Sequence, residues 1–367
     1  MIIHFSVLGV ILVVSLLWER YEKLNKLKSN DYVMHALPFI IIFGYLAFLA
    51  AMRTNMNDTS VYRFSFENIP GTFSDIKDII NSDGKDKAFN ITANLFKMLF
   101  SDNYHWWFAF CAIIESLIFV HVLRRESASI LVSCFYFFAS TLYYNYFSMM
   151  RQWLAVALFF LAFRFIKEKR FWSYLILCLI AAQFHNSAYL CIPVYFFASI
   201  KPWSKKQLSL VVAFCIALLF LNPLLLSLEG SESTYDYVYA TMATNSGSSP
   251  IRIIIAAVPV ILCFIYRERI ENEHNKALDV AISMSILNLL LTIVATFTSG
   301  LYIIRMSTYF NLFNMIVFSW LLEKIIRGQN KSVIKLCFYV FYLAFYVYQM
   351  KYQGAFGYSS DILGTFN

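Results

Sequence analysis

Three arginines stand at the ends of long apolar runs, where a cation is costly unless it faces a partner or a cavity. They are Arg53, Arg151 and Arg305. A guanidinium stays charged at any working pH and binds phosphate oxygens through paired hydrogen bonds. Three such groups around one cavity would bind a diphosphate and stabilise the charge that grows on it as it leaves. Alternatively, each arginine extends its charge to the interfacial water while its stem stays in lipid.

Two residues are candidates for the base that takes a proton from an attacking hydroxyl. His185 lies in Gln-Phe-His-Asn-Ser-Ala, between two short apolar segments, and could be a general base or a donor to phosphate. Asp58 follows the second apolar run and offers a carboxylate for the same task. The competing interpretations are a structural histidine and a solvated loop acid, and the residues alone leave the choice of base open.

Other polar and aromatic residues lie beside these candidates and could bind substrate. They are Gln152, Asn186, Tyr62, Tyr302 and Tyr309. Tyr302 and Tyr309 stand three residues before and four residues after Arg305, on the same face of a helix. Their rings could stack on sugars. The chain has 24 Tyr and 37 Phe, however, and most aromatic side chains in such a chain pack in the core or at the interface.

Several motifs that would indicate other chemistry are missing from the sequence. It has no P-loop, no GxGxxG, no HExxH and no Asp-x-Asp. The seven cysteines lie in apolar runs without a CxxC pair, and we interpret them as small buried hydrophobes. We therefore expect no cofactor, no metal and no nucleotide.

The elements that must position these residues are membrane helices. Hydrophobic residues make up 60% of the 367 residues and charged residues 14%, against roughly 45–50% and 25% in soluble domains. Lipid leaves no water for unpaired backbone groups, so the apolar runs should be helices. We expect a single all-α domain, 1–367, a polytopic integral membrane protein with about twelve transmembrane or re-entrant helices, near 2–18, 33–51, 106–123, 128–147, 152–166, 172–184, 186–199, 207–227, 251–266, 278–298, 303–322 and 333–350.

Basic clusters set the predicted orientation of these runs. They begin at Arg20, Arg124, Lys167, Lys201, Arg267 and Lys324, and they alternate with loops that have no cluster. Placing all of them in the cytoplasm puts both termini outside and makes 172–199 cross twice or form a re-entrant hairpin, with its turn at Gln183–Ser187. The net charge of +8 is then a matter of topology, and we expect no nucleic acid partner.

Two larger loops become external in this orientation. They are 52–104, with a possible amphipathic helix near 88–100, and 228–250, which is rich in Ser, Thr and Tyr. External loops of this size usually carry function or cap a cavity. The three arginines and His185 also fall on the external side, so we expect the site there.

These segments, in this order, resemble the Wzy/EpsG-type polysaccharide polymerase family. The resemblance rests on Arg53 with Asn-Asp-Thr and Tyr62, on Met-Arg-Gln at Arg151, on Phe-His-Asn-Ser-Ala at His185, and on Arg305 with Tyr309. It covers roughly residues 1–325, and the stretch from Met-Arg-Gln to His-Asn-Ser-Ala is its most specific part.

The resemblance implies a metal-independent glycosyltransferase of the bacterial cytoplasmic (inner) membrane that makes O-antigen, capsule or exopolysaccharide. It would move a growing glycan from undecaprenyl diphosphate to a hydroxyl of a lipid-linked repeat unit. Arg151 and Arg305, with Arg53, would hold the diphosphate, and His185 or Asp58 would be the base. The implied partners are the undecaprenyl-diphosphate-linked oligosaccharide and membrane lipid, with a chain-length regulator and a flippase of the same pathway as further candidates.

Two other functions fit a chain of this kind. A membrane-bound O-acyltransferase would use His185 with a cytoplasmic donor, but the outward placement of that residue argues against it. A transporter or flippase of lipid-linked oligosaccharide would favour inverted repeats or paired helices broken by Gly or Pro, which the sequence does not show.

Overall fold

The computed structural model describes residues 2–25, 32–82, 84–219, 247–297, 300–353 and 357–364. Helices dominate this part of the chain, and no strand occurs in it apart from one isolated bridge between Asn55 and Ser359. The predicted all-α class is therefore confirmed for the described residues. Most of the predicted loop 228–250 lies outside them.

The chain divides into two units. The first unit comprises Met1–Phe163, Trp172–Ile192 and Phe318–Asn367, and the second comprises Arg164–Phe171 and Pro193–Val317. The first unit holds α1 (Ile2–Asn25), α2 (Tyr32–Met52), α3 (Thr59–Glu67), α4 (Phe73–Asn81), α5 (Lys87–Leu99), α6 (Tyr104–Glu126), α7 (Ile130–Ala139), η1 (Leu142–Tyr146), most of α8 (Met150–Lys167) and α9 (Phe171–Phe184), η2 (Asn186–Cys191), η3 (Leu321–Ile325) and α19 (Lys331–Gln353). The second unit holds α10 (Val194–Ala198), α11 (Lys205–Leu219), α14 (Ile251–Ile265), α15 (Arg267–Asn272), α16 (Lys276–Phe297), α17 (Gly300–Asn311) and most of α18 (Asn314–Trp320).

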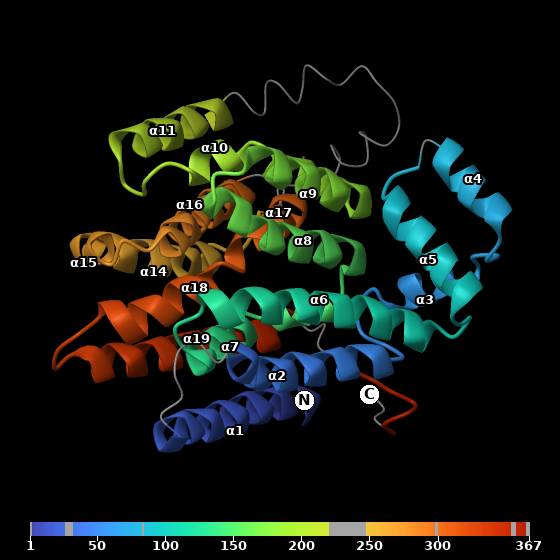
Figure 1. Cartoon of the computed structure of the whole chain (residues 1–367), viewed down its shortest axis with the longest axis horizontal. Helices are drawn as coiled ribbons and strands as arrows, with labels where there is room; N and C mark the ends of the chain where they lie inside the picture. Colours follow the sequence, from blue (N-terminus) through green and yellow to red (C-terminus); the bar gives the residue numbers. More distant parts are fainter. Residues whose placement is uncertain are drawn as a thin grey trace. The chain divides into compact units, whose positions relative to one another are not determined.

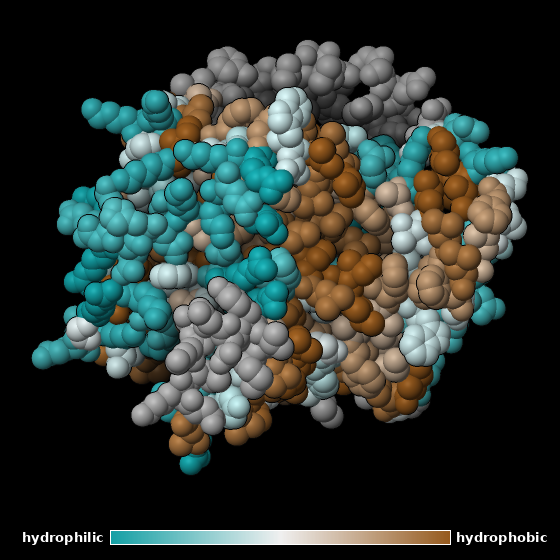
Figure 2. Space-filling view, in the orientation of Figure 1, coloured by the Kyte–Doolittle hydropathy of each residue, from teal (hydrophilic) through white to brown (hydrophobic). Residues whose placement is uncertain are grey.

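Five helices in the described part are long and apolar enough to cross a membrane. They cover Ile3–Leu24, His35–Met52, Tyr104–Glu126, Lys276–Phe297 and Lys331–Tyr352. Three shorter apolar helices cover Ile130–Ala139, Phe171–Phe184 and Ile251–Ile265. In Figure 2, hydrophobic side chains form continuous areas on the surface, as lipid-facing helices require. The chain is a helical membrane protein, and the number of twelve spans stays a prediction.

Three predicted runs are interrupted where the backbone leaves the helix, and one of them, 186–199, divides into η2 and α10 on either side of Pro193. The run 128–147 breaks after α7, because Thr141 adopts a left-handed conformation, with φ of 64°, that a continuous helix cannot hold. The run 303–322 divides into α17 and α18, and Asn314 there donates a side-chain hydrogen bond to Asn311 (3.0 Å). At the break, Phe313 and Met315 donate their N–H groups three residues back, to Phe310 (3.2 Å) and Leu312 (3.2 Å), in place of the regular spacing of four.

The helices of the first unit alternate in direction. In Figure 1, the start of α1, the end of α2 and the start of α6 lie at one end of this unit, together with α3, α4 and α5. The opposite ends of α1 and α6 carry basic residues, including Lys23, Arg124 and Arg125. Under the predicted orientation, the end that carries α3–α5 is the external one.

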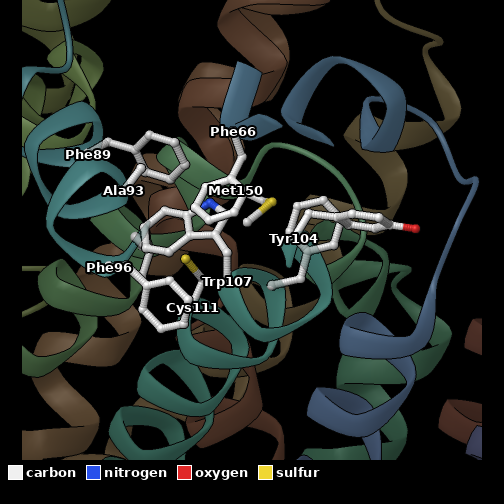
Figure 3. Close-up of a cluster of buried hydrophobic side chains, with 10 residues drawn as sticks. Phe66, Phe89, Ala93, Phe96, Tyr104, Trp107, Cys111 and Met150 are labelled. Atoms are coloured by element: carbon white, nitrogen blue, oxygen red, sulfur yellow. The ribbon is translucent and has the colours of Figure 1, made fainter. Parts of the chain in front are cut away.

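An aromatic core holds α3 and α5 of the 52–104 segment against α6. Phe66 of α3 stacks on Trp107 of α6, with ring centroids 5.8 Å apart and planes 5° apart. Phe89 and Phe96 of α5 contact the same indole at 5.4 Å and 5.5 Å. All four side chains are buried, and Figure 3 shows their rings gathered together. Each such pair contributes about 0.5–1.5 kcal/mol beyond its buried area, so the core fixes α5, which lies where the helix near 88–100 was predicted.

Candidate functional site

The residue before α5 turns its side chain away from its own helix. Asp86 is the N-cap of α5, yet its carboxylate makes no capping hydrogen bond. It accepts instead from Nη1 of Arg151 (3.4 Å), from Nδ1 of His185 (3.4 Å) and from the backbone N–H of Asn186 (3.2 Å). All four residues belong to the first unit. The carboxylate therefore joins the segment 52–104 to the start of α8 and to the turn after α9.

The conformation of Asp86 carries a local cost. Its φ of 58° places it in the left-handed region, which costs an L-residue roughly 1–2 kcal/mol, although Asp tolerates it better than most. The absence of a capping hydrogen bond at α5 costs about another 1 kcal/mol of stability. Bonds to the side chains of Arg151 and His185 must offset both costs, so this conformation depends on the cluster.

The sequence around Arg151 and His185 explains how both reach Asp86. Arg151 is the second residue of α8, which begins after Met149 in a left-handed conformation. Its guanidinium carbon lies 5.8 Å from the ring centre of Tyr62 and 5.5 Å from that of Phe89. His185 has an extended backbone between α9 and η2, so the α-helix ends there, within the predicted interruption at Gln183–Ser187.

Burial divides the cluster into a hidden carboxylate and two accessible donors. The side chain of Asp86 is 8% exposed, whereas those of Arg151 and His185 are 31% and 32% exposed. A ligand can therefore reach the guanidinium and the imidazole while Asp86 stays behind them.

The electrostatics of the cluster keep Asp86 ionised. Burial favours a higher pKa for this carboxyl, but the hydrogen bond and charge of His185, the Asn186 N–H and the charge of Arg151 outweigh it and lower the pKa below its ordinary value. An ionised carboxylate only accepts hydrogen bonds. His185 must then donate through Nδ1, and a neutral ring held in this way has the lone pair of Nε2 available for a proton.

The family model of the EpsG family matches residues 36–360, a range that includes Asp86 and every predicted site residue. The chain belongs to the EpsG family. The predicted resemblance is therefore confirmed, and membership indicates a polysaccharide polymerase in a membrane. Searches of curated proteins and of solved structures gave no match.

The predicted site residues of this EpsG family member fall into three groups. The structure brings together Arg151, His185 and Asn186 around Asp86. Tyr62 lies near the guanidinium of Arg151, and Gln152, the next residue in the chain, is buried. A second group lies at the end of α2 and the start of α3. There Arg53 is buried, and Asp58 is the N-cap of α3 without a capping hydrogen bond. Among the described residues, no hydrogen bond or ion pair connects either of them to Asp86.

The third group belongs to the second unit. Arg305 is an exposed residue of α17, and Tyr309, one turn later, is fully buried. Tyr302 is in the same helix, and its side chain lies outside the described part of the structure. The segment is helical, as the spacing required. Tyr309 is 0% exposed, so this structure does not offer its ring for stacking on a sugar.

Asp86 is the residue that sequence reasoning missed in this EpsG family chain. Its local signal is an acid just before an amphipathic helix, which predicts an ordinary N-cap. In the structure, its side chain instead accepts hydrogen bonds from Arg151 and His185, which lie 65 and 99 residues away in the sequence. Among the described residues, no group of three or more His, Cys, Asp or Glu could hold a metal ion.

Proposed function

We propose that this protein polymerises polysaccharide at the external face of the bacterial cytoplasmic membrane. It would transfer a growing glycan from undecaprenyl diphosphate to a hydroxyl of a lipid-linked repeat unit. The observation that supports this most directly is the Asp86 cluster, in which one buried carboxylate holds an imidazole and a guanidinium that are both accessible. A base and a phosphate-binding cation side by side are what this transfer needs.

Each group has one task in the proposed reaction. The acceptor hydroxyl attacks the anomeric carbon of the growing glycan while the bond from that carbon to the diphosphate oxygen breaks, through an oxocarbenium-like transition state. His185 takes the hydroxyl proton at Nε2, and Asp86 stabilises the imidazolium that forms. Arg151 holds the departing diphosphate. A guanidinium has five N–H donors, so its contact with Asp86 through Nη1 leaves others for phosphate oxygens.

The cluster favours His185 over Asp58 as the base, because Asp86 orients its ring. The expectation that Arg305 is a second cation for the diphosphate rests on the sequence alone and stays a prediction. We assign Tyr62 and Asn186 to the sugar side of the site. The donor arrives already activated, so nucleotide and metal are not required. Membrane lipid, a chain-length regulator and a flippase of the same pathway are the proposed partners.

The surface glycan of a deletion strain tests the function directly. We expect single repeat units in place of a long polymer, and polymer restored by the wild-type gene and not by the His185→Gln variant expressed at the same level. Long polymer in the deletion strain would show that another protein carries out the reaction.

A further inference from the structure

The end of α2 is capped by side chains from distant parts of the chain. The last four carbonyls of a helix have no partner within it, and in α2 these belong to Leu49, Ala50, Ala51 and Met52. Each of them accepts from a different side chain, in this order: the hydroxyl of Tyr358 (2.9 Å), Nη1 of Arg53, Nδ1 of His105 (2.7 Å) and Oγ of Ser360 (2.5 Å).

Two of the four donors come from the C-terminal segment, residues 357–364. Its backbone also pairs with the chain just after α2. Thr54 donates to the carbonyl of Ser359 (2.9 Å), and Ser359 and Asn55 exchange N–H to carbonyl bonds of 3.0 Å and 3.3 Å. Tyr358 and Ser360 are both buried. The C-terminal segment is thus built into the first unit at the point where the segment 52–104 leaves α2.

Arg53 connects this cap to α3. Its Nε donates to Oγ1 of Thr59, the first residue of α3 (3.1 Å), and its guanidinium carbon lies 4.1 Å from the ring centre of Phe108 in α6. The residue is 1% exposed. A guanidinium that is buried, stacked on a ring and bonded to two elements holds those elements in place and is closed to a diphosphate.

The next turn of α3 leads to the Asp86 cluster. Tyr62 stands three residues after Thr59, and its ring lies 5.8 Å from the guanidinium carbon of Arg151 and 6.1 Å from the ring of Phe89. The start of α3 therefore sets where Tyr62 lies, and Tyr62 lies beside the guanidinium of Arg151.

We propose that Arg53 and the C-terminal segment are positioning elements, which hold α3 so that Tyr62 orients the guanidinium of Arg151. This inference rests on the proposed function and gives Arg53 a different role from the diphosphate ligand expected from the sequence. Tyr358 and Ser360, which lie more than 200 residues from Arg151, become contributors to the rate of transfer.

Kinetics of cap variants test the positioning role. Tyr358→Phe removes one donor without changing shape, and a lost hydrogen bond corresponds to roughly a 2- to 13-fold effect. We expect kcat to fall within that range while KM changes less than about twofold, because the misplaced group acts on the leaving diphosphate. The matched control is Tyr352→Phe, an exposed tyrosine at the end of α19, which should leave kcat unchanged.

A second background separates positioning from general loosening of the fold. If the cap acts through Tyr62, then Tyr358→Phe and Ser360→Ala should have almost no further effect on kcat in a Tyr62→Ala protein. Equal losses with and without Tyr62 would overturn the proposal, as would wild-type kcat for Tyr358→Phe alone.

A disulfide tests the placement of the C-terminal segment independently of activity. Asn55 and Ser359 exchange two backbone bonds, a pairing in which Cα atoms lie about 5.5 Å apart, within the range of disulfides. We expect Asn55→Cys/Ser359→Cys to form a disulfide on oxidation, and the locked protein to keep its rate. No disulfide would refute the cap itself. If the disulfide forms and neither the locked nor the wild-type protein makes polymer, the proposed function is refuted, and the positioning role with it.

Discussion

Replacing Asp86 with asparagine tests whether the cluster performs the chemistry. The change keeps the size of the side chain and removes the charge. Asparagine also tolerates the left-handed backbone of position 86, where φ is 58°, so the variant should fold. What changes is the partner of His185. An amide can donate to Nδ1, which would place the ring proton on Nε2 and leave no lone pair for the acceptor hydroxyl.

The size of the expected loss follows from the role of the base. General base catalysis contributes roughly 10²–10⁴ in rate, or about 3–5 kcal/mol of activation free energy. Asp86 is 8% exposed, so water cannot substitute fully for the missing carboxylate. We expect Asp86→Asn to lower kcat by about this range and to change KM much less, because Arg151 remains and still binds phosphate.

The assay is the initial rate of elongation of lipid-diphosphate oligosaccharide by purified protein, with polymer length as a second readout. Asp78→Asn is the matched control, since Asp78 is an exposed acid of α4 outside the cluster, and it should retain the wild-type rate. Asp58→Asn discriminates between the two base candidates. A wild-type rate for well-folded Asp86→Asn, together with a loss for Asp58→Asn, would refute the assignment of His185.

Four further predictions follow from the same geometry. Arg151→Lys should lower kcat by roughly 10²–10³ although it keeps the charge, because lysine lacks the paired donors of a guanidinium. Arg63→Lys is the control, since Arg63 is in an exposed ion pair of α3, and its kcat should change little. If Arg305 binds the same diphosphate, the double variant Arg151→Lys/Arg305→Lys should lose much less than the product of the two single losses. Because the folded-state pKa of Asp86 is lowered, its contribution to stability is present above the ordinary carboxyl pKa and is lost as pH falls through the folded-state pKa. The melting temperatures of wild type and Asp86→Asn should therefore differ at pH 7 and converge below about pH 4. A difference that stays constant with pH would contradict this. Purified protein should elongate substrate in EDTA without nucleotide, and activity that disappears in EDTA and returns with Mg²⁺ or Mn²⁺ would exclude the mechanism. Gly84→Cys should react with an impermeant thiol reagent in intact cells, and Ser204→Cys should not. Labelling at position 204 would refute the predicted double crossing of 172–199.

Much of the fold could be predicted because lipid imposes a simple rule on the chain. Most described residues of the predicted apolar runs are helical, since a regular helix satisfies the polar groups of its backbone within a bilayer. Hydropathy does not report where a helix breaks inside an apolar run. The left-handed residue at Thr141 and the division between α17 and α18 are features of local backbone conformation and hydrogen bonding, which apolarity does not encode.

The candidate site was predictable only in part, for a similar reason. Arg151 and His185 stand out because a cation and an imidazole at the ends of apolar runs are unusual. Asp86 does not stand out, since acids are common in polar loops and before helices. Asp86 meets its partners because the aromatic core of α3, α5 and α6 places the start of α5 next to the start of α8. Contacts between residues so far apart in sequence depend on the packing of whole helices.

Arg53 and Arg151 show why residue type and position were not enough to assign a role. Both are arginines at the end of an apolar run, and both were predicted from the sequence to bind the diphosphate. In the structure, Arg53 is 1% exposed and bonded to the end of α2 and the start of α3, while Arg151 is 31% exposed beside an ionised carboxylate. The difference arises from neighbours that are remote in sequence, among them Phe108 for Arg53 and Asp86 for Arg151. A guanidinium surrounded by protein acceptors stabilises the fold, and one that keeps donors at an accessible surface can bind phosphate.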